Sequence, residues 1–208
     1  MRKINDYYSE KARKDKYPAR SVYKLEEVQK KYKILKGGQR VLDLGCHTGS
    51  WCIYASQIVG EKGAVVGVDL QHTDLPSQKG HAEITWLCYD VFADDLVRQL
   101  RGKWHGFHVL LSDMAPRTTG NRFSDHQHSI RLARRALEIA GDLLHENGTF
   151  YCKVFQGEDF PEVVKECKPL FKTVKVVKPD SSRKESREVF ILCRGFNPKA
   201  KSTDSKTS

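Results

Sequence analysis

Several features of common protein classes are missing from this 208-residue sequence. No apolar run approaches the ~20 residues of a membrane-spanning helix, and the charged start at Arg2 and Lys3 does not resemble a secretion signal. Proline and glycine, with 7 and 15 residues, are too few for a chain that is disordered throughout. We therefore expect one folded domain in the cytoplasm, with no membrane partner.

Metal-binding patterns of cysteine and histidine are missing as well. The 6 cysteines are scattered and contain no C-x-x-C pair, so we expect reduced thiols in the core instead of disulfides or a zinc site. His126 and His128 form an H-x-H pair with no third ligand nearby, and we expect both to be solvated. The sequence therefore predicts no metal site.

Acidic residues are scarce at both ends of the chain. Residues 1–36 carry 12 Lys/Arg against 5 Asp/Glu, and residues 165–208 also carry 12 against 5. The middle, residues 37–164, carries 12 against 16, so the net charge of +10 comes from the ends. Basic segments that fold onto one face would bind a polyanion such as RNA or DNA. Solvated basic segments without a partner are the alternative.

Residues 40–51 combine an apolar strand with a glycine-containing turn and the start of a helix. Gly45 and Gly49 let the backbone approach a ligand closely, and Ser50 is expected to cap the helix. A dinucleotide site needs G-x-G-x-x-G, but His47 and Ser50 stand where the second and third glycines belong. The pattern favours a ligand without a pyrophosphate, such as an adenosyl sulfonium.

Aspartates stand at the ends of three predicted strands, which cover residues 63–69, 84–90 and 107–113. Asp69 is placed to bind ribose hydroxyls, and Asp90 to accept a hydrogen bond from an adenine amino group. A single strand-end aspartate is as often a turn cap. Three such residues, with Asp113, are harder to explain in that way, so we interpret them as one ligand site.

The remaining pattern predicts an α/β domain. Further strands are expected at residues 41–44, 149–155, 172–178 and 188–193, and helices at residues 18–33, 53–59, 93–100, 130–144 and 159–168. Lys153 lies in apolar company in one of these strands, where burial is costly unless the lysine has a use or a partner.

Three segments follow from this division of the chain. Residues 1–17 are expected to form a basic arm that orders on nucleic acid, residues 18–196 the folded domain, and residues 197–208 a disordered polar tail. Residues 117–124 are expected to form a mobile loop over the ligand site.

Six motifs together resemble the FtsJ family of RNA 2′-O-ribose methyltransferases, and the resemblance covers residues 5–195. The motifs are Pro18-Ala-Arg-Ser-Val-Tyr-Lys-Leu-Glu-Glu, Asp43-Leu-Gly, Ser112-Asp-Met-Ala-Pro, Lys153-Val-Phe-Gln-Gly, Lys178-Pro-Asp-Ser-Ser-Arg and Ser186-Arg-Glu-Val. This resemblance implies a Rossmann-like, S-adenosylmethionine-dependent methyltransferase fold, with a seven-stranded, mostly parallel sheet and helices on both faces.

The resemblance also implies the site residues. The family's catalytic Lys-Asp-Lys-Glu set falls on Lys24, Asp113, Lys153 and Glu188. Lys153 is then the proton acceptor for the ribose 2′-hydroxyl, and Lys24 and Glu188 position the hydroxyl and that lysine. Orientation of the hydroxyl is the alternative role for Lys153, because a lysine is protonated at neutral pH unless its surroundings lower its pKa.

Contacts with S-adenosylmethionine are implied for five residues, which are Gly49, Trp51, Asp69, Asp90 and Asp113. The family's turn usually reads Gly-Ala-Ala-Pro-Gly-Gly-Trp, and this chain departs from it at residues 46–48 and 50. The outer glycines and the tryptophan are kept. We therefore expect cofactor binding with a changed loop shape.

The implied activity is 2′-O-methylation of a uridine in large-subunit (23S) ribosomal RNA by a monomer, with the large ribosomal subunit as the partner. The alternatives are methylation of another RNA, such as a transfer RNA anticodon loop or an mRNA cap, and a non-catalytic RNA-binding protein of ribosome assembly. A nicotinamide oxidoreductase is disfavoured by the glycine spacing.

Overall fold

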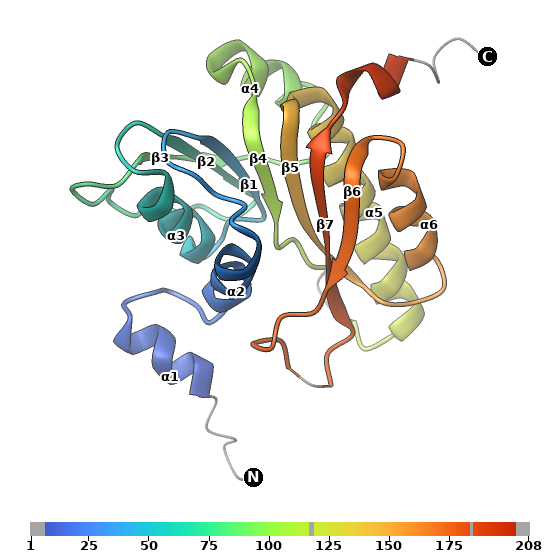
Figure 1. Cartoon of the computed structure of the whole chain (residues 1–208). Helices are drawn as coiled ribbons and strands as arrows, with labels where there is room; N and C mark the ends of the chain where they lie inside the picture. The colour runs from blue at the N-terminus through green and yellow to red at the C-terminus, as the bar shows by residue number, and fades with distance from the viewer. Residues whose placement is uncertain (1–6, 117–118, 184, 203–208) are drawn as a thin grey trace.

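Seven strands form one sheet in the order β3-β2-β1-β4-β5-β7-β6 (Figure 1). The computed structural model describes residues 7–116, 119–183 and 185–202. The strands are β1 (Arg40–Leu44), β2 (Ala64–Asp69), β3 (Glu83–Cys88), β4 (Phe107–Ser112), β5 (Leu144–Phe155), β6 (Phe171–Val177) and β7 (Glu188–Phe196). The helices are α1 (Tyr7–Lys14), α2 (Val22–Tyr32), α3 (Ser50–Val59), α4 (Leu96–Trp104), α5 (Arg122–Leu143) and α6 (Phe160–Cys167), followed by a 3₁₀ helix, η1 (Pro198–Ser202).

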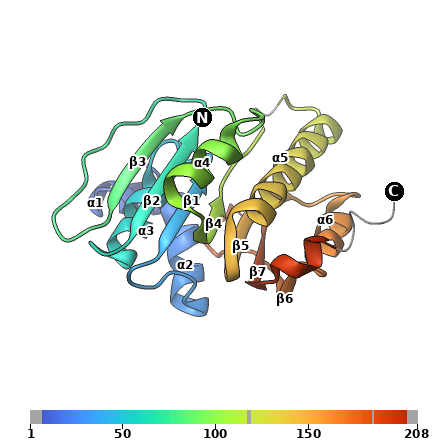
Figure 2. The same cartoon turned by 90° about the horizontal axis from the view of Figure 1, so that it is seen from above.

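Helices cover both faces of the sheet, and Figure 2 shows them on its two sides. Successive strand residues point to opposite faces, so Val41 packs with α2 and α3, whereas Leu42 packs with α4, α5 and α6. Val65 and Val66 in β2 divide between the two cores in the same way. Both faces are buried, which explains why the central strands are apolar almost throughout. The predicted α/β fold with a seven-stranded, mostly parallel sheet is confirmed.

Strand β7 is antiparallel to both of its neighbours, β5 and β6. In this register Lys153 lies opposite Phe190, and Phe155 lies opposite Glu188. Paired residues share a face, and so do residues two apart. The insertion of β7 therefore brings Lys153 and Glu188 to the same face of the sheet.

The starts of two helices differ most from the predictions. Helix α2 begins at Val22 instead of residue 18. Helix α5 begins at Arg122, because the Asn121 side chain accepts hydrogen bonds from the amides of Phe123 and Ser124 and caps the helix. Part of the loop expected at residues 117–124 is therefore helical, and residues 117–118 lie outside the described residues.

Both ends of the described chain contact the folded domain. In α1, Ala12 is buried, the Tyr8 and Tyr23 rings lie 5.5 Å apart, and Tyr23 donates a hydrogen bond to Asp15. At the other end, the amide of Asn197 donates to the carbonyl of Leu170, just before β6, and η1 follows. The division into an arm at residues 1–17, a domain at residues 18–196 and a disordered tail at residues 197–208 stays a prediction.

The cysteines behave as expected from their apolar surroundings. All six are free, five are buried, and Cys88 is exposed. Among the described helices, none combines the length and the apolar character that crossing a membrane requires.

Candidate active site

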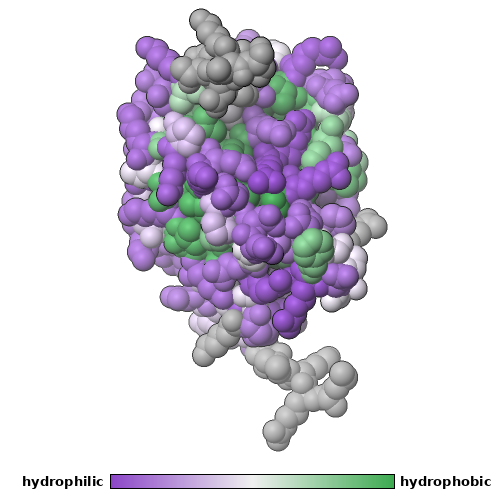
Figure 3. Space-filling model, turned by 90° about the vertical axis from the view of Figure 1, so that its right-hand side faces the viewer, coloured by the Kyte–Doolittle hydropathy of each residue, from purple (hydrophilic) through white to green (hydrophobic). Residues whose placement is uncertain are grey.

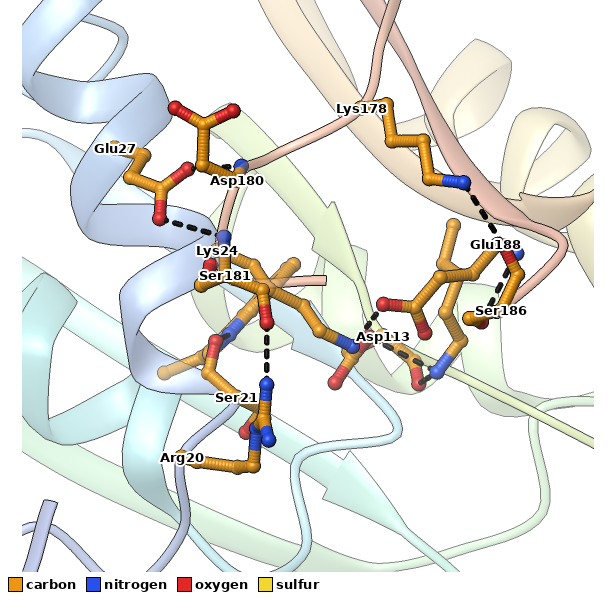
Figure 4. A network of polar contacts seen from close by, with 12 residues as sticks. Arg20, Ser21, Lys24, Glu27, Asp113, Lys178, Asp180, Ser181, Ser186 and Glu188 are labelled. Carbon is orange, nitrogen blue, oxygen red and sulfur yellow. Dashed lines mark hydrogen bonds and ion pairs between the residues drawn. The ribbon is translucent and has the colours of Figure 1, made fainter. Parts of the chain in front are cut away.

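Two ion pairs lie at the edge of the sheet where the parallel strands end. Lys153 Nζ lies 2.9 Å from Asp113 Oδ1 and also donates a hydrogen bond to the Asp113 carbonyl. Lys24 Nζ lies 2.7 Å from Glu188 Oε1. Figure 4 shows Lys24, Asp113 and Glu188 pointing toward one another. The four residues of the implied catalytic set therefore come together from four different elements.

The four side chains of this set are largely, but not completely, buried. Lys153 is 7% exposed and Asp113 is 18% exposed, while Lys24 and Glu188 are each 12% exposed. A charge that is removed from water to this extent needs a partner. The pairing of each lysine with a carboxylate satisfies that requirement and leaves both pairs at the surface of the site.

A stack of three aromatic rings lies next to Lys24, whose Nζ is 5.7 Å from the centre of the Phe190 ring. The Trp51 and Tyr151 rings stack at 5.6 Å, and the Tyr151 and Phe190 rings stack at 4.8 Å. Trp51 Nε1 donates to the carbonyl of Ser21, and the Tyr151 hydroxyl donates to the carbonyl of Lys24. These bonds fix the first turn of α2 against the sheet, and Lys24 is positioned by that turn.

The loop between β6 and β7 is attached to the same helix. Glu27 accepts hydrogen bonds from the amides of Asp180 and Ser181, at 2.7 and 3.0 Å, and Arg20 donates to the carbonyl of Ser181 at 2.5 Å (Figure 4). Glu27 lies three residues after Lys24, so both side chains project from one face of α2. The helix therefore holds the Lys24 amine and the loop together.

The same loop leads directly into Glu188. Lys178 Nζ donates to the carbonyl of Ser186, and Ser186 Oγ accepts a hydrogen bond from the amide of Glu188 (Figure 4). The loop is thus held at its start, middle and end. The position of the Glu188 carboxylate depends on these bonds as well as on its pairing with Lys24.

A turn shaped by two glycines follows β1 at this edge. Gly45 has φ +77°, and a Cβ there would lie 2.6 Å from a Met114 side-chain carbon and 3.0 Å from the Met114 backbone. Gly49 has φ +98° and is the N-cap of α3. The predicted cap at Ser50 is wrong, because Ser50 Oγ instead accepts a hydrogen bond from the amide of Ala19.

The predicted ligand aspartates flank this turn. Asp69 ends β2, and its two oxygens accept hydrogen bonds from the amides of His47 and Gln71. Asp90 comes two residues after β3 and accepts from the amide of Phe92. Because carboxyl ends of parallel strands meet at one edge, both residues lie at the same edge as Asp113. Each carboxylate keeps lone pairs for a further donor.

The structure places Trp51 differently from the other implied cofactor residues. Its side chain is 3% exposed and is used in the aromatic stack and in the bond to Ser21. The turn itself departs from the family pattern at His47, whose peptide bond to Thr48 is cis and whose ring contacts Thr73.

Polar atoms without partners lie under the turn. Thr48 Oγ1 and Asp43 Oδ1 are both buried, and neither forms a hydrogen bond with another described residue. Burial raises the pKa of Asp43 to about 7, although a hydrogen bond from Cys52 Sγ opposes the shift. Unused hydrogen-bonding capacity therefore lies beside the glycine-containing turn.

Sequence reasoning missed two residues near this edge. Glu27 gave a signal, since it follows Lys24 by three residues on a helix. His126 was expected to be solvated, but it is 4% exposed and contacts Asp159, so that prediction is wrong. The early start of α5 turns His126 inward, against the backbone of Gly157. His128 is exposed, as predicted.

The fold and this site define a Rossmann-like methyltransferase. Residues 17–196 match the FtsJ-like methyltransferase family. The chain therefore belongs to the FtsJ-like methyltransferase family, as its motifs indicated. Among the residues that the structure describes, no group of three or more His, Cys, Asp or Glu side chains is arranged to hold a metal ion.

Relatives match over almost their whole length. The protein named Ribosomal RNA large subunit methyltransferase E of Desulfotalea psychrophila is 54% identical over 192 residues, which cover 92% of this chain and 96% of that protein. The protein of the same name from Desulfosudis oleivorans is 46% identical and covers 95% and 93%. The crystal structure of a Plasmodium falciparum protein described as a ribosomal RNA methyltransferase aligns with a TM-score of 0.73, 26% identity, and coverage of 86% and 98%.

Proposed function

We propose that this protein transfers a methyl group from S-adenosylmethionine to the 2′-hydroxyl of a uridine in 23S ribosomal RNA. The observation that carries the proposal is the convergence of two lysine–carboxylate pairs beside a glycine-shaped turn. Membership of the family and the names of the relatives support the reaction and the ribosomal RNA substrate.

The residues at the turn fit S-adenosylmethionine. Asp69 would accept hydrogen bonds from the ribose hydroxyls, and Asp90 from the adenine amino group. The turn requires glycine at Gly49, because its φ is +98° and a Cβ there would lie 2.8 Å from a Leu75 side-chain carbon. Trp51 would contribute through its main chain, since its indole is buried in the aromatic stack. When bound, the cofactor supplies an electrophilic methyl group on a sulfonium centre.

Lys153 is the proposed proton acceptor. Its amine contacts both Asp113 Oδ1 and the Asp113 carbonyl. To act as a base, the amine would first have to give up the proton that it carries in the ion pair with Asp113. It would then keep two N–H groups for these two contacts, with its lone pair in the remaining tetrahedral direction. That geometry suits the removal of a proton from a hydroxyl, and a positioned base of this kind contributes roughly 10²–10⁴-fold to a rate.

Lys24 and Glu188 are proposed to orient the ribose. Lys24 keeps N–H groups beyond the one that faces Glu188, and these can donate to the substrate oxygen and hold its lone pair toward the methyl group. Methyl transfer requires the attacking oxygen to lie in line behind the methyl carbon, so correct positioning carries much of the catalysis.

The surroundings of the reaction are also part of the proposal. We propose that the chain is a monomer, that it acts in the cytoplasm, and that it modifies ribosomal RNA within the large subunit. Size-exclusion chromatography tests the monomer, and a mass of two chains would contradict it.

The experiment that tests the function uses a labelled methyl group. The protein is incubated with labelled S-adenosylmethionine and, separately, with protein-free 23S RNA, large ribosomal subunits and transfer RNA. We expect label in the large-subunit material. Label in transfer RNA alone would identify transfer RNA, instead of 23S RNA, as the substrate. No label in any RNA would contradict the activity.

A further inference from the structure

A groove of about 480 Å³ lies at the end of the sheet opposite the candidate active site. Residues at the starts of β4, β5 and β6 and at the end of β7 line it. In Figure 1 the β7 arrow points toward this end of the sheet. Lys24, Asp113, Lys153 and Glu188 lie at the other end of the strands.

Cations from both basic ends of the chain meet in this groove. Lys33 and Lys36 come from the segment after α2, and Lys172 and Arg194 come from β6 and β7. Glu146 is the acidic residue among those that line the groove. Within the described ranges, Lys33, Lys36 and Arg194 form no ion pair. The groove therefore carries an excess of positive charge that faces solvent.

The floor of the groove is polar and fixed. Arg40 donates to Nε2 of His145 at 2.8 Å and to the carbonyl of Gly106, while the Arg40 amide donates to Nδ1 of His108. Both imidazoles accept a hydrogen bond, so both are neutral. Burial and the nearby Arg40 charge lower the pKa of each histidine, in agreement with that state. The two histidines therefore line the groove without adding charge.

Lys172 is held across the groove by its surroundings. Its Nζ donates to Asn147 Oδ1 at 2.7 Å. Gly195, with φ +75°, leaves room for the lysine stem, because a Cβ there would lie 2.8 to 3.0 Å from three Lys172 side-chain carbons. A solvated lysine needs no such accommodation.

Lysines also lie along the edge strand between the groove and the active site. Lys172 and Lys175 are in β6, on opposite faces because they are three residues apart, and Lys178 follows in the loop, where it donates to the carbonyl of Ser186. Seven strand residues span roughly 23 Å. The side of the molecule that lies to the right in Figure 1 is mostly hydrophilic, with smaller hydrophobic areas between the polar side chains (Figure 3).

We propose that this groove binds the phosphate backbone of the substrate RNA, at a segment remote from the methylated nucleotide. The RNA crosses the edge strand β6 on its way from the active site. This inference rests on the proposed function. The other explanation for lysines on an edge strand is protection against pairing with another sheet, but that explanation does not account for Lys33, Lys36 and Arg194, which lie off the strand.

The test compares two charge-matched double variants of the full chain. K172Q/R194Q removes two groove cations and keeps a donor that can reach Asn147. K79Q/R98Q removes two exposed cations of the β3–α4 side. Binding to protein-free 23S RNA is measured between 50 and 200 mM salt, and the slope of log K against log salt is recorded. We expect K172Q/R194Q to bind roughly 10-fold more weakly with a slope smaller by roughly 1.5, since each phosphate contact contributes about 0.7–0.9.

RNA binding by the two variants tests the groove, and RNA binding by wild type tests the proposed function. Binding of K172Q/R194Q that matches K79Q/R98Q would overturn the inference. So would a loss seen only with assembled subunits, which would indicate a ribosomal protein at the groove. Wild-type protein that binds no 23S RNA would overturn the proposed function itself. Thermal unfolding and S-adenosylmethionine affinity of both variants show whether a loss of RNA binding reflects misfolding.

Discussion

Lys153 is the residue whose chemistry the account depends on most. It lies in a buried strand, and its amine is oriented by both the carboxylate and the carbonyl of Asp113. A base and an orienting donor would be held by the same contacts. A side chain that is always positively charged can still orient the hydroxyl, but it cannot accept its proton.

A Lys153→Arg variant separates the two roles. Arginine keeps the charge and the donors, but it does not release a proton at physiological pH. We expect kcat to fall at least roughly 100-fold with little change in S-adenosylmethionine affinity. Single-turnover methyl transfer measures the effect. A variant that keeps most of its activity would rule out the base role and leave orientation.

Asp43 makes a second prediction at the scale of one residue. Its pKa is near 7 in the fold, because burial disfavours the charge, against 3.8 as the ordinary value. As the pH rises, Asp43 loses its proton near pH 4 in the unfolded chain but keeps it until about pH 7 in the fold. The free energy of unfolding therefore falls as the pH rises from about 4 to 7. We expect Asp43→Asn to remove that loss.

The measurement is the free energy of unfolding in urea at pH 5 and pH 8. From pH 5 to pH 8, the free energy of unfolding of wild type is expected to fall by up to about 3 kcal/mol more than that of Asp43→Asn. An equal pH dependence of the two proteins would show that Asp43 is ionised in the fold.

Single residues of the site could be predicted, whereas their partners could not. Lys153 stood out because a lysine in an apolar strand needs a reason to be there. Its contact with the Asp113 carbonyl is a backbone feature that no residue pattern reports. Trp51 matched the motif, yet its indole supports Tyr151 and Phe190 in the core.

At the scale of elements, α2 holds Lys24 and the β6–β7 loop together. Glu27 uses both of its oxygens on the loop, at Asp180 and Ser181. Removal of one acceptor would loosen the loop and, through it, Glu188. We expect Glu27→Gln to lower kcat roughly 3- to 10-fold, since a hydrogen bond to a charged group contributes about 1.5–3 kcal/mol and part of it survives in the amide.

The matched control is Glu26→Gln, one residue away on the same helix. Glu26 pairs with Lys30 and Lys11 at the surface, and such pairs contribute little. Methyl transfer and S-adenosylmethionine affinity are measured for both variants. Equal rates in Glu27→Gln and Glu26→Gln would show that the loop needs no attachment to α2.

The elements themselves were largely predictable, and their exceptions have physical causes. Apolar strands separated by helices predicted the parallel sheet. The length of α5 was underestimated because its first two turns are polar, and its cap at Asn121 is a local interaction. The place of β7 between β5 and β6 follows from long-range pairing, which periodicity does not contain.

At the scale of the whole molecule, the basic ends of the chain are expected to act together in binding RNA. Residues 1–16 contain 6 Lys/Arg against 3 Asp/Glu, and part of this segment is the packed helix α1. We expect removal of residues 1–16 to weaken 23S RNA binding more than it weakens S-adenosylmethionine binding, because the loss is mainly of charge. Filter binding and calorimetry measure the two affinities. Parallel losses would indicate a structural role for the segment.

Lys153 and its neighbours are proposed to promote methyl transfer to a ribose 2′-oxygen in large-subunit RNA. The most direct measurement is transfer of a labelled methyl group into that RNA by wild type and Lys153→Ala, followed by alkaline hydrolysis, which cannot cleave next to a 2′-O-methyl group. We expect one labelled, alkali-resistant dinucleotide from wild type and none from the variant. Label released as single nucleotides, or equal labelling by both proteins, would contradict it.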